Sequence, residues 1–450
     1  MTKIRYLLLP CATLMALAPT GHSQVLTQPR ESGGISGIPI ITGFMSYQSN
    51  IAPGTFDLNP EFDPVLLVPI GNKTLLSSEF DMSLDVSHTD GSWGPAPVDH
   101  GFDYLQVSHN ISPNLTAVAG RYLVPFGIYR ERMHPLWIRY LQQEPISFTL
   151  NATSGNGGML RGGTHLGYYA NVEYSGYYSA ATSTMIVQSD KQAGFRGSLV
   201  LPEKRIEIGS SFNDTMGAGA HKMVGTDFTW LLKRVPLDIR SETLFSKQAG
   251  NTYWVEGAYK LSQLGRGSFL KYTSIVYRQE QFWLPKGATN LSAMTGTMGS
   301  LPDTNTARST GGVAYSLTPN LRFNASYQGN YATAEHAHSW NMGVTFRFAT
   351  CTGVLLRPIV AASKTDATGA RVTSTSSSGS ATRGAASPGP KRRHAIDADE
   401  AYKSNCMRCH TGLAQYSPRM SKTILMHMRV DGNIPGDEAD AILEYLRGAD

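Results

Sequence analysis

Apolar and polar side chains alternate strictly in LRFNASYQ (residues 321–328) and in WNMGVTFRF (residues 340–348). A period of two sends neighbouring side chains to opposite faces of a sheet, so both stretches are predicted to be β-strands. Similar alternation recurs upstream, for example at residues 205–217 and 252–263, while helical periodicity is almost absent between residues 39 and 348. This long region is therefore predicted to be all-β.

Two architectures fit such strands. A soluble β-sandwich turns its apolar face into a core, whereas a membrane barrel turns that face towards lipid and lines a wet lumen with the polar face. Many segments run for roughly 10–15 residues, which is long for a sandwich strand but enough to cross a bilayer at a tilt. The ending Phe346-Arg347-Phe348 resembles the terminal signal that outer-membrane assembly machinery reads on porin-type proteins. An antiparallel transmembrane β-barrel of about 14 strands is expected, with 12 or 16 also compatible.

The positions of the strands follow from the same alternation. They are expected near residues 39–50, 74–89, 100–112, 114–128, 167–179, 193–202, 205–217, 221–235, 237–249, 252–263, 268–282, 307–319, 321–332 and 338–348. The long segments 129–158 and 283–306 are expected either outside the barrel or folded inward to narrow it. His134 and Trp137 could touch a solute, although a solvated loop histidine and an interfacial aromatic are the simpler expectation.

The amino-terminal sequence predicts export. Two basic residues precede an apolar run (residues 6–18) and a small-x-small cleavage site (residues 21–23), so residues 1–23 are predicted to be a signal peptide. The alternative, a retained membrane anchor, would need a longer apolar run. Residues 24–350 are then assigned to a barrel in the outer membrane of a Gram-negative bacterium, with lipid around it. The net charge of +5 is small and dispersed, so no nucleic-acid partner is expected.

Beyond the barrel the composition changes abruptly. Residues 351–395 consist largely of Ser, Thr, Gly, Ala and Pro, which cannot bury enough apolar surface to offset chain entropy. They are predicted to form a flexible linker to a separate domain at residues 396–450.

The sequence CMRCH at residues 406–410 is a C-x-x-C-H haem-attachment motif. Two thiols one helical turn apart can reach the two vinyl groups of one haem, and the adjacent histidine then lies beneath the iron. Cys406 and Cys409 are therefore expected to bind one haem c covalently, with His410 as an iron ligand. A zinc site or a Cys406–Cys409 disulfide are the alternatives. Zinc would need further ligands, and a disulfide would leave His410 unexplained.

Helices are expected on both sides of this motif. Asp397 followed by Glu400 gives a capping-box-like start, and residues 436–447 carry apolar side chains on one helical face. These parts resemble the class I cytochrome c family over about 55 residues, which implies a small all-α domain whose core is the porphyrin itself.

The same resemblance implies a methionine as the sixth iron ligand. Met428 stands a few residues before the final helix, as in the family, although Arg429 replaces the proline often found there. His427 is the alternative ligand, and Met426 and Met420 are remoter candidates. Pro418 is placed where its carbonyl oxygen could accept the Nδ1 hydrogen of His410.

A barrel joined to a haem indicates electron transfer, so the protein is expected to be an electron carrier or channel rather than an enzyme. The chain resembles fused porin–cytochrome proteins proposed to carry electrons across the outer membrane in metal-oxidising bacteria. Those proteins carry the haem segment before the barrel, whereas here the order is reversed.

Size limits where a haem domain can sit. A barrel of about 14 strands leaves a lumen roughly 18 Å wide, whereas a domain of about 55 residues is roughly 26 Å across. The domain is therefore expected at the periplasmic mouth or on its tether. Because one haem cannot span about 30 Å of hydrocarbon, a periplasmic or external redox partner, or a solute or mediator in the pore, must complete the path. The alternative is a solute channel whose tethered cytochrome serves a separate redox enzyme.

Overall fold

The structure is a computed structural model that describes residues 37–150, 154–166, 169–217, 220–263, 268–285, 302, 304–332, 336–351, 354–355, 398–406 and 418–448. The predicted signal peptide and nearly all of the predicted linker lie outside the described residues. So do Cys409 and His410.

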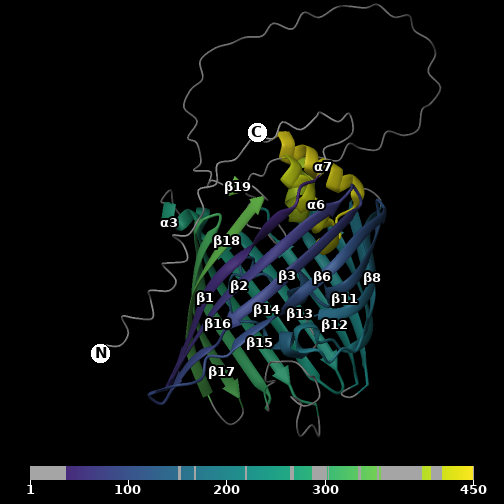
Figure 1. The fold of residues 1–450 in the computed structure, drawn as a ribbon. Coiled ribbons are helices and arrows are strands. Elements are labelled where there is room, and N and C mark those ends of the chain that lie inside the picture. Colours follow the sequence, from purple (N-terminus) through teal and green to yellow (C-terminus); the bar gives the residue numbers. More distant parts are fainter. Residues whose placement is uncertain are drawn as a thin grey trace, which may run out of the picture.

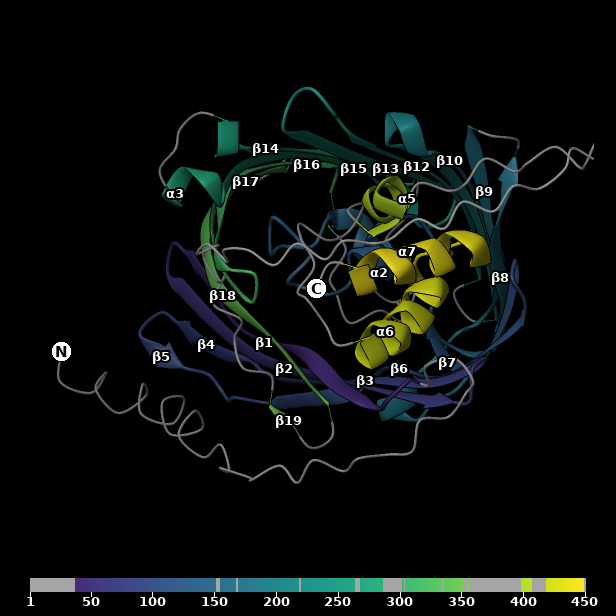
Figure 2. The ribbon, with the colours of Figure 1, turned by 90° about the horizontal axis from the view of Figure 1, so that it is seen from above.

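Sixteen antiparallel strands form a closed barrel (Figures 1 and 2). They are β1 (Ile40–Ala52), β2 (Thr55–Ile70), β3 (Thr74–Leu84), β6 (Val98–Ser112), β7 (Leu115–Leu123), β8 (Ser154–Leu166), β9 (Ala170–Ala180), β10 (Lys191–Leu201), β11 (Ile206–Met216), β12 (His221–Leu231), β13 (Leu237–Ser246), β14 (Gly250–Lys260), β15 (Thr273–Trp283), β16 (Thr306–Thr318), β17 (Leu321–Ala332) and β18 (His336–Cys351). The wall closes where β1 pairs with β18. Three short strands extend the same sheet: β4 (Val86–Thr89), β5 (Ser92–Trp93) and β19 (Val354–Leu355). The predicted barrel is confirmed, and its 16 strands match the upper of the expected alternatives rather than the preferred count of about 14.

The two strands that the sequence pattern missed are β2 and β8. β2 contains Pro60 and Pro64, and β8 contains five glycines, so both read as loops. On the β1 side, Pro60 lies opposite Tyr47 and Pro64 opposite Gly43. The opposite edge of β2 pairs with β3 and β4, and there neither proline has a paired residue opposite it. A proline has no N–H to donate, so these breaks in the pairing allow it to lie within a paired wall strand.

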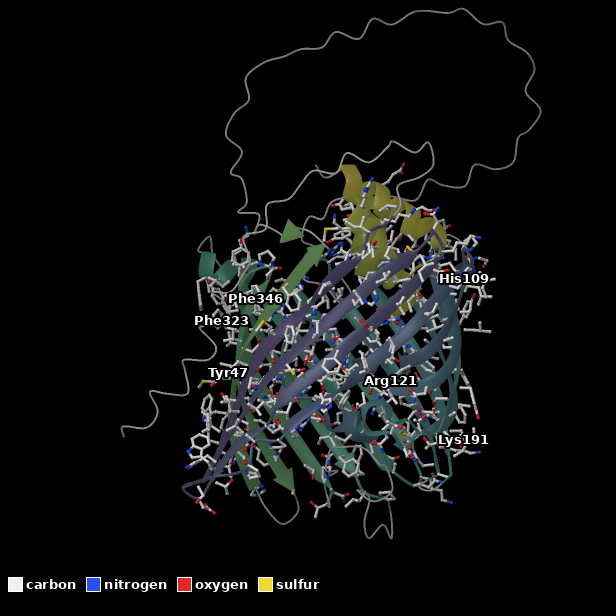
Figure 3. All side chains as sticks on the ribbon, in the orientation of Figure 1. Tyr47, His109, Arg121, Lys191, Phe323 and Phe346 are labelled. Carbon is white, nitrogen blue, oxygen red and sulfur yellow. The ribbon has the colours of Figure 1, made fainter. Side chains whose placement is uncertain are left out.

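The two faces of the wall have opposite character. Phe195 on β10 is 57% exposed on the outside, whereas the next residue, Arg196, is 3% exposed and faces the lumen. Tyr47, Phe323 and Phe346 are likewise exposed (Figure 3). An outer face covered with large apolar side chains excludes the sandwich alternative, in which those side chains would form the core.

Residues 124–150 fold into the lumen and reach several wall strands. This inward segment contains α2 (Tyr129–Arg132) and η2 (Ile146–Leu150), a 3-10 helix. The Tyr140 hydroxyl donates to Asp238 of β13 at 2.7 Å, and the Ile146 amide donates to Glu280 of β15 at 2.7 Å. Of the two placements expected for residues 129–158, the structure adopts the inward one through residue 150. The second long segment, 283–306, lies mostly outside the described residues.

The remaining helices are short. They are η3 (Met185–Val187), η4 (Pro202–Lys204), η5 (Leu261–Gln263), α3 (Ser268–Lys271), α5 (Ala398–Asn405), α6 (Pro418–Asp431) and α7 (Gly436–Gly448). None of the helices in the described part of the chain is long and apolar enough to cross a membrane. α7 occupies the range expected for the final helix, whereas α6 was not expected.

Helices α5, α6 and α7 lie over the barrel mouth at which β1 begins and β18 ends (Figures 1 and 2). The Thr423 hydroxyl of α6 donates to the carbonyl oxygen of Ile38, just before β1, at 2.8 Å. Met420 and Met426 of α6 belong to an apolar cluster with wall residues. We call the cluster the docking cluster; its buried members are Ile40, Val65, Leu67, Leu75, Tyr104, Leu123, Met420 and Met426.

Candidate functional site

A second apolar cluster lies among the three helices. We call it the helix cluster; its buried members are Ala401, Tyr402, Cys406, Leu425, Ile434, Ala439 and Ile442, and Met428, Leu443, Tyr445 and Leu446 pack against them. Cys406 follows α5 directly and is only 7% exposed. The rings of Tyr402 and Tyr445 stack at 5.1 Å between centroids, which joins α5 to α7.

The candidate iron ligands on α6 face different surroundings. Met428 packs against the helix cluster that contains Cys406. His427 points the other way: its Nε2 lies 3.0 Å from Asp431, and its ring centroid lies 6.2 Å from that of Tyr104 in the wall. Met420 and Met426 belong to the docking cluster. Met428 is therefore the candidate that packs against the same cluster as Cys406, while Pro418 is the first residue of α6.

The electrostatics of His427 agree with this placement. Burial opposes the charge on His427, but the neighbouring Asp431 carboxylate raises the pKa of the imidazole above its ordinary value. Burial also opposes the charge on Asp431, and His427 holds the pKa of that carboxyl below its ordinary value. The two side chains thus form a charged pair on the barrel-facing side of α6.

Polar contacts join the helices to the wall and to the inward segment. Arg161 of β8 donates from Nε to Asn433 at 2.8 Å, and from Nη2 to Glu131 of α2 at 3.2 Å. Nearby, Asn171 of β9 donates to Glu438 of α7 at 2.8 Å. The helices are therefore held at the mouth by hydrogen bonds as well as by apolar packing.

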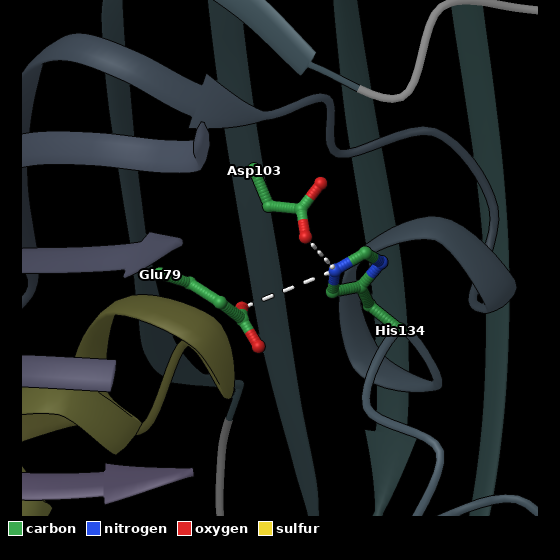
Figure 4. Close-up of side chains that lie close together, drawn as sticks. All are labelled: Glu79, Asp103 and His134. Atoms are coloured by element: carbon green, nitrogen blue, oxygen red, sulfur yellow. Dashed lines mark hydrogen bonds and ion pairs between the residues drawn. The ribbon is translucent and has the colours of Figure 1, made fainter. Parts of the chain in front are cut away.

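A histidine and two carboxylates meet inside the barrel (Figure 4). Nε2 of His134, which follows α2, lies 3.0 Å from Asp103 Oδ2 on β6 and 3.9 Å from Glu79 Oε2 on β3. A β-bulge at this point of the β3–β6 pairing leaves Asp103 without an opposite residue, because Glu79 pairs with Tyr104. Burial would lower the pKa of His134, but Asp103 and Glu79 raise it to about 9.

The expectation that His134 is a solvated loop histidine is therefore wrong. The inward segment carries it into the lumen, where only 13% of its side chain is exposed. Trp137 is not an interfacial aromatic either, because the Arg347 guanidinium on the lumen face of β18 lies over its ring at 4.8 Å.

Three more carboxylates stand beside this group. Glu61 and Asp63 of β2 and Asp81 of β3 have side-chain oxygens within 4.8 Å of one another. Sequence reasoning missed all five acids. The available signal was the i, i+2 spacing of Glu61 with Asp63 and of Glu79 with Asp81, which places each pair on one face of a strand.

Comparisons with known proteins concern the barrel. No protein-family model matches the sequence, and no curated protein matches it. Solved structures that are similar include OmpF of Salmonella typhi in complex with daunomycin, at 11% identity and a TM-score of 0.44, covering 69% of this chain and 98% of that one. OprB of Pseudomonas putida has 10% identity and a TM-score of 0.43, covering 69% and 92%. An anion-selective porin from Comamonas acidovorans has 11% identity and a TM-score of 0.41, covering 69% and 98%.

Proposed function

We propose that the chain is an outer-membrane barrel that carries one c-type haem at its periplasmic mouth and takes part in electron transfer at or across that membrane. The apolar outer face and the charged lumen support a bilayer location. Because the wall has an even number of strands, it begins and ends at the same mouth, which in bacterial single-chain barrels is the periplasmic one. The helices lie at that mouth.

The haem would be held by Cys406 and Cys409, with His410 and Met428 as iron ligands. The observation that carries this proposal is that Met428 and Cys406, which are 22 positions apart, pack in one apolar cluster. A thiol and a thioether surrounded by apolar side chains are a donor set that suits haem c. When bound, such a haem supplies one-electron redox chemistry, and methionine ligation tends to raise its potential.

The residues of the chain have distinct tasks in this proposal. The helix cluster excludes water from the haem environment, and the docking cluster keeps α6 at the mouth. His427 is a weaker ligand candidate than Met428, because it already pairs with Asp431 on the barrel side. Electrons would pass to a periplasmic or external redox partner.

The first test is the mass of the purified, exported chain, which should exceed the protein mass by one haem. The variant Cys406→Ser with Cys409→Ser should lose it. For the sixth ligand, Met428→Leu should let carbon monoxide bind the reduced haem and lower its potential, whereas the matched variant Met426→Leu should do neither. An exported chain with no added haem mass would end the proposal.

Transfer across the membrane needs a separate test. With the protein in sealed vesicles and its helices inside, an impermeant donor added outside should reduce the haem. The alternative, a solute channel with a tethered redox module, is favoured by the charged lumen, in which Arg196 pairs with Glu207 and Asp227. Solute conductance that is the same with and without the two cysteines, together with no reduction from outside, would select this alternative.

A further inference from the structure

We propose that His134, Asp103 and Glu79 form a binding site for a divalent first-row transition-metal ion in the barrel lumen. The site lies outside the helix cluster, so the proposal goes beyond the haem and does not depend on it. Its three ligands come from β3, β6 and the inward segment, which meet only in the folded barrel (Figure 4).

The spacing of the ligand atoms fits such an ion. Zinc ligands lie about 2.0–2.2 Å from the metal, so neighbouring ligand atoms of a tetrahedral site are about 3.3 Å apart. The distance from His134 Nε2 to Asp103 Oδ2 is 3.0 Å, and that from His134 Nε2 to Glu79 Oε2 is 3.9 Å. A small rotation of the Glu79 side chain would bring all three atoms to coordinating distance.

Two carboxylates inside the barrel share a single imidazole. The Glu79 side chain is only 4% exposed, and its charged partner within the described part of the chain is His134 at 3.9 Å, the same imidazole that lies 3.0 Å from Asp103. Close by, Asp63 is 2% exposed, and its Oδ1 has no hydrogen-bond partner in the described part of the chain. Buried polar groups are normally paired, and buried carboxylates are normally balanced by cations. One imidazole for two carboxylates, with the unpaired Asp63 oxygen close by, therefore favours a bound cation.

Besides His134, the two arginines whose charges act on Asp103 form their hydrogen bonds with other groups. Arg121 donates to the Phe102 carbonyl and, at 2.7 Å, to the Gln188 carbonyl. Arg139 donates to the carbonyl oxygens of Met133 and His134, each at 2.6 Å. Within the ranges that the structure describes, neither guanidinium forms a hydrogen bond with Glu79 or Asp103.

The imidazole selects the class of metal. Calcium and magnesium prefer oxygen ligands alone, whereas zinc, manganese and iron accept a mixture of imidazole and carboxylate. The neighbouring group of Glu61, Asp63 and Asp81 has no nitrogen ligand. The histidine therefore distinguishes the proposed site from a general attraction of cations to an acidic lumen.

The experiment uses zinc as the probe and the full-length protein without a histidine tag. After metal removal, calorimetry in detergent should show one zinc ion bound per chain, with calcium unable to displace it at equal concentration. X-ray absorption at the zinc edge should show one imidazole and carboxylate oxygens. His134→Ala should weaken binding at least about tenfold, as should Glu79→Gln, because loss even of residues that only support a ligand costs about that much. His109→Ala, which removes an exposed rim histidine, should leave binding unchanged.

The outcomes separate cleanly. Unchanged zinc binding in both His134→Ala and Glu79→Gln, or a zinc spectrum without imidazole, would overturn the proposal. So would a wild-type protein that binds no zinc at micromolar concentration. If His134→Ala fails to assemble, Glu79→Gln and Asp103→Asn keep the lumen volume nearly unchanged and test the same ligand set. Haem content should be equal in all variants, so failure here leaves the proposed electron-transfer function untouched.

Discussion

Arg161 is completely buried, and its guanidinium links its own strand to two other parts of the chain. It extends from the wall strand β8, pairs with Glu131 of the inward segment and donates to Asn433 between α6 and α7. Removing a charge from water is costly, and here the cost is offset only while both partners stay in place. The residue thus couples the position of the helices to that of the inward segment.

Replacing Arg161 by Met should loosen both attachments. The change leaves the Glu131 carboxylate buried without its partner, which costs about 3–5 kcal/mol. After trypsin cleaves the predicted linker at residues 391–393, the carboxyl-terminal fragment should co-purify with the wild-type barrel but separate from the variant. Lys222→Met, at a side chain that is 68% exposed, should cost at most about 1 kcal/mol and retain the fragment.

The His427–Asp431 pair should make docking of the helices depend on pH. Because the pKa of His427 is raised in the folded chain, the stabilisation that this side chain gives to the docked helices is complete below 6.5, its pKa in the unfolded chain. The stabilisation is lost as the pH rises through the raised pKa of the folded chain. Because the pKa of Asp431 is lowered in the folded chain, the stabilisation that this carboxylate gives to the docked helices is complete above 3.8, its pKa in the unfolded chain. It is lost as the pH falls through the lowered pKa. The barrel should therefore retain the cleaved carboxyl-terminal fragment most strongly between pH 3.8 and pH 6.5. A wild-type alkaline decline that persists in His427→Gln would contradict this assignment.

At the level of elements, the alternating strands could be predicted, because their pattern is local. β2 and β8 could not, because the features that let them pair lie in other strands: the breaks opposite Pro60 and Pro64 are visible only once β3 is in place. α6 was missed for a similar reason. It has apolar contacts on two sides, with the docking cluster and with the helix cluster, so its sequence lacks a single apolar stripe.

The barrel-facing side of α6 provides a direct test of docking. Met420 is 1% exposed in the docking cluster, so Met420→Asp would place a charge among wall residues and should release the helices. The neighbouring Arg419 is exposed, and Arg419→Asp should have little effect. Retention of the cleaved fragment by both variants would show that apolar packing does not hold α6.

The close contact between β1 and β2 can be tested at Gly43. Its φ is +137°, and a Cβ there would lie 2.0 Å from the Asp63 carbonyl oxygen. Gly43→Ala should therefore strain the first hairpin by at least about 1–3 kcal/mol and lower the yield of assembled barrel. A Cβ added at Gly176 on β9 would meet nothing within 4 Å among the described residues, so Gly176→Ala is the matched control and should assemble normally. Equal yields of the two variants on semi-native gels would refute the expectation.

For the whole molecule, the sequence predicted the class of barrel but not how its interior is filled. The path of residues 124–150 is set by partners on strands far away in sequence, such as Asp238 and Glu280. The group of His134, Asp103 and Glu79 arises from the same long-range assembly. The local periodicity of the sequence contains no information about contacts between residues far apart in the chain. This explains why the five carboxylates were missed and why His134 was expected to be exposed to solvent.

The helices should restrict passage through the mouth that they cover. A chain that ends at residue 395 lacks α5, α6 and α7, and its conductance in planar bilayers should rise several-fold if the inward segment leaves a path beside it. Arg419→Asp, which keeps all three helices, is the control. An unchanged conductance after truncation would mean that the inward segment alone limits flow.

The hydrogen bond from the Thr423 hydroxyl to the Ile38 carbonyl oxygen connects the carboxyl-terminal part of the chain to the start of the first strand. The surface that receives α6 is contributed by β1, β2, β3, β6 and β7, so it exists only after these strands have come together. Pairing of these five strands therefore has to precede seating of the helices. A chain arrested before these strands meet would leave its tail open to proteases, so that an intact tail would mark a chain whose first strands have assembled.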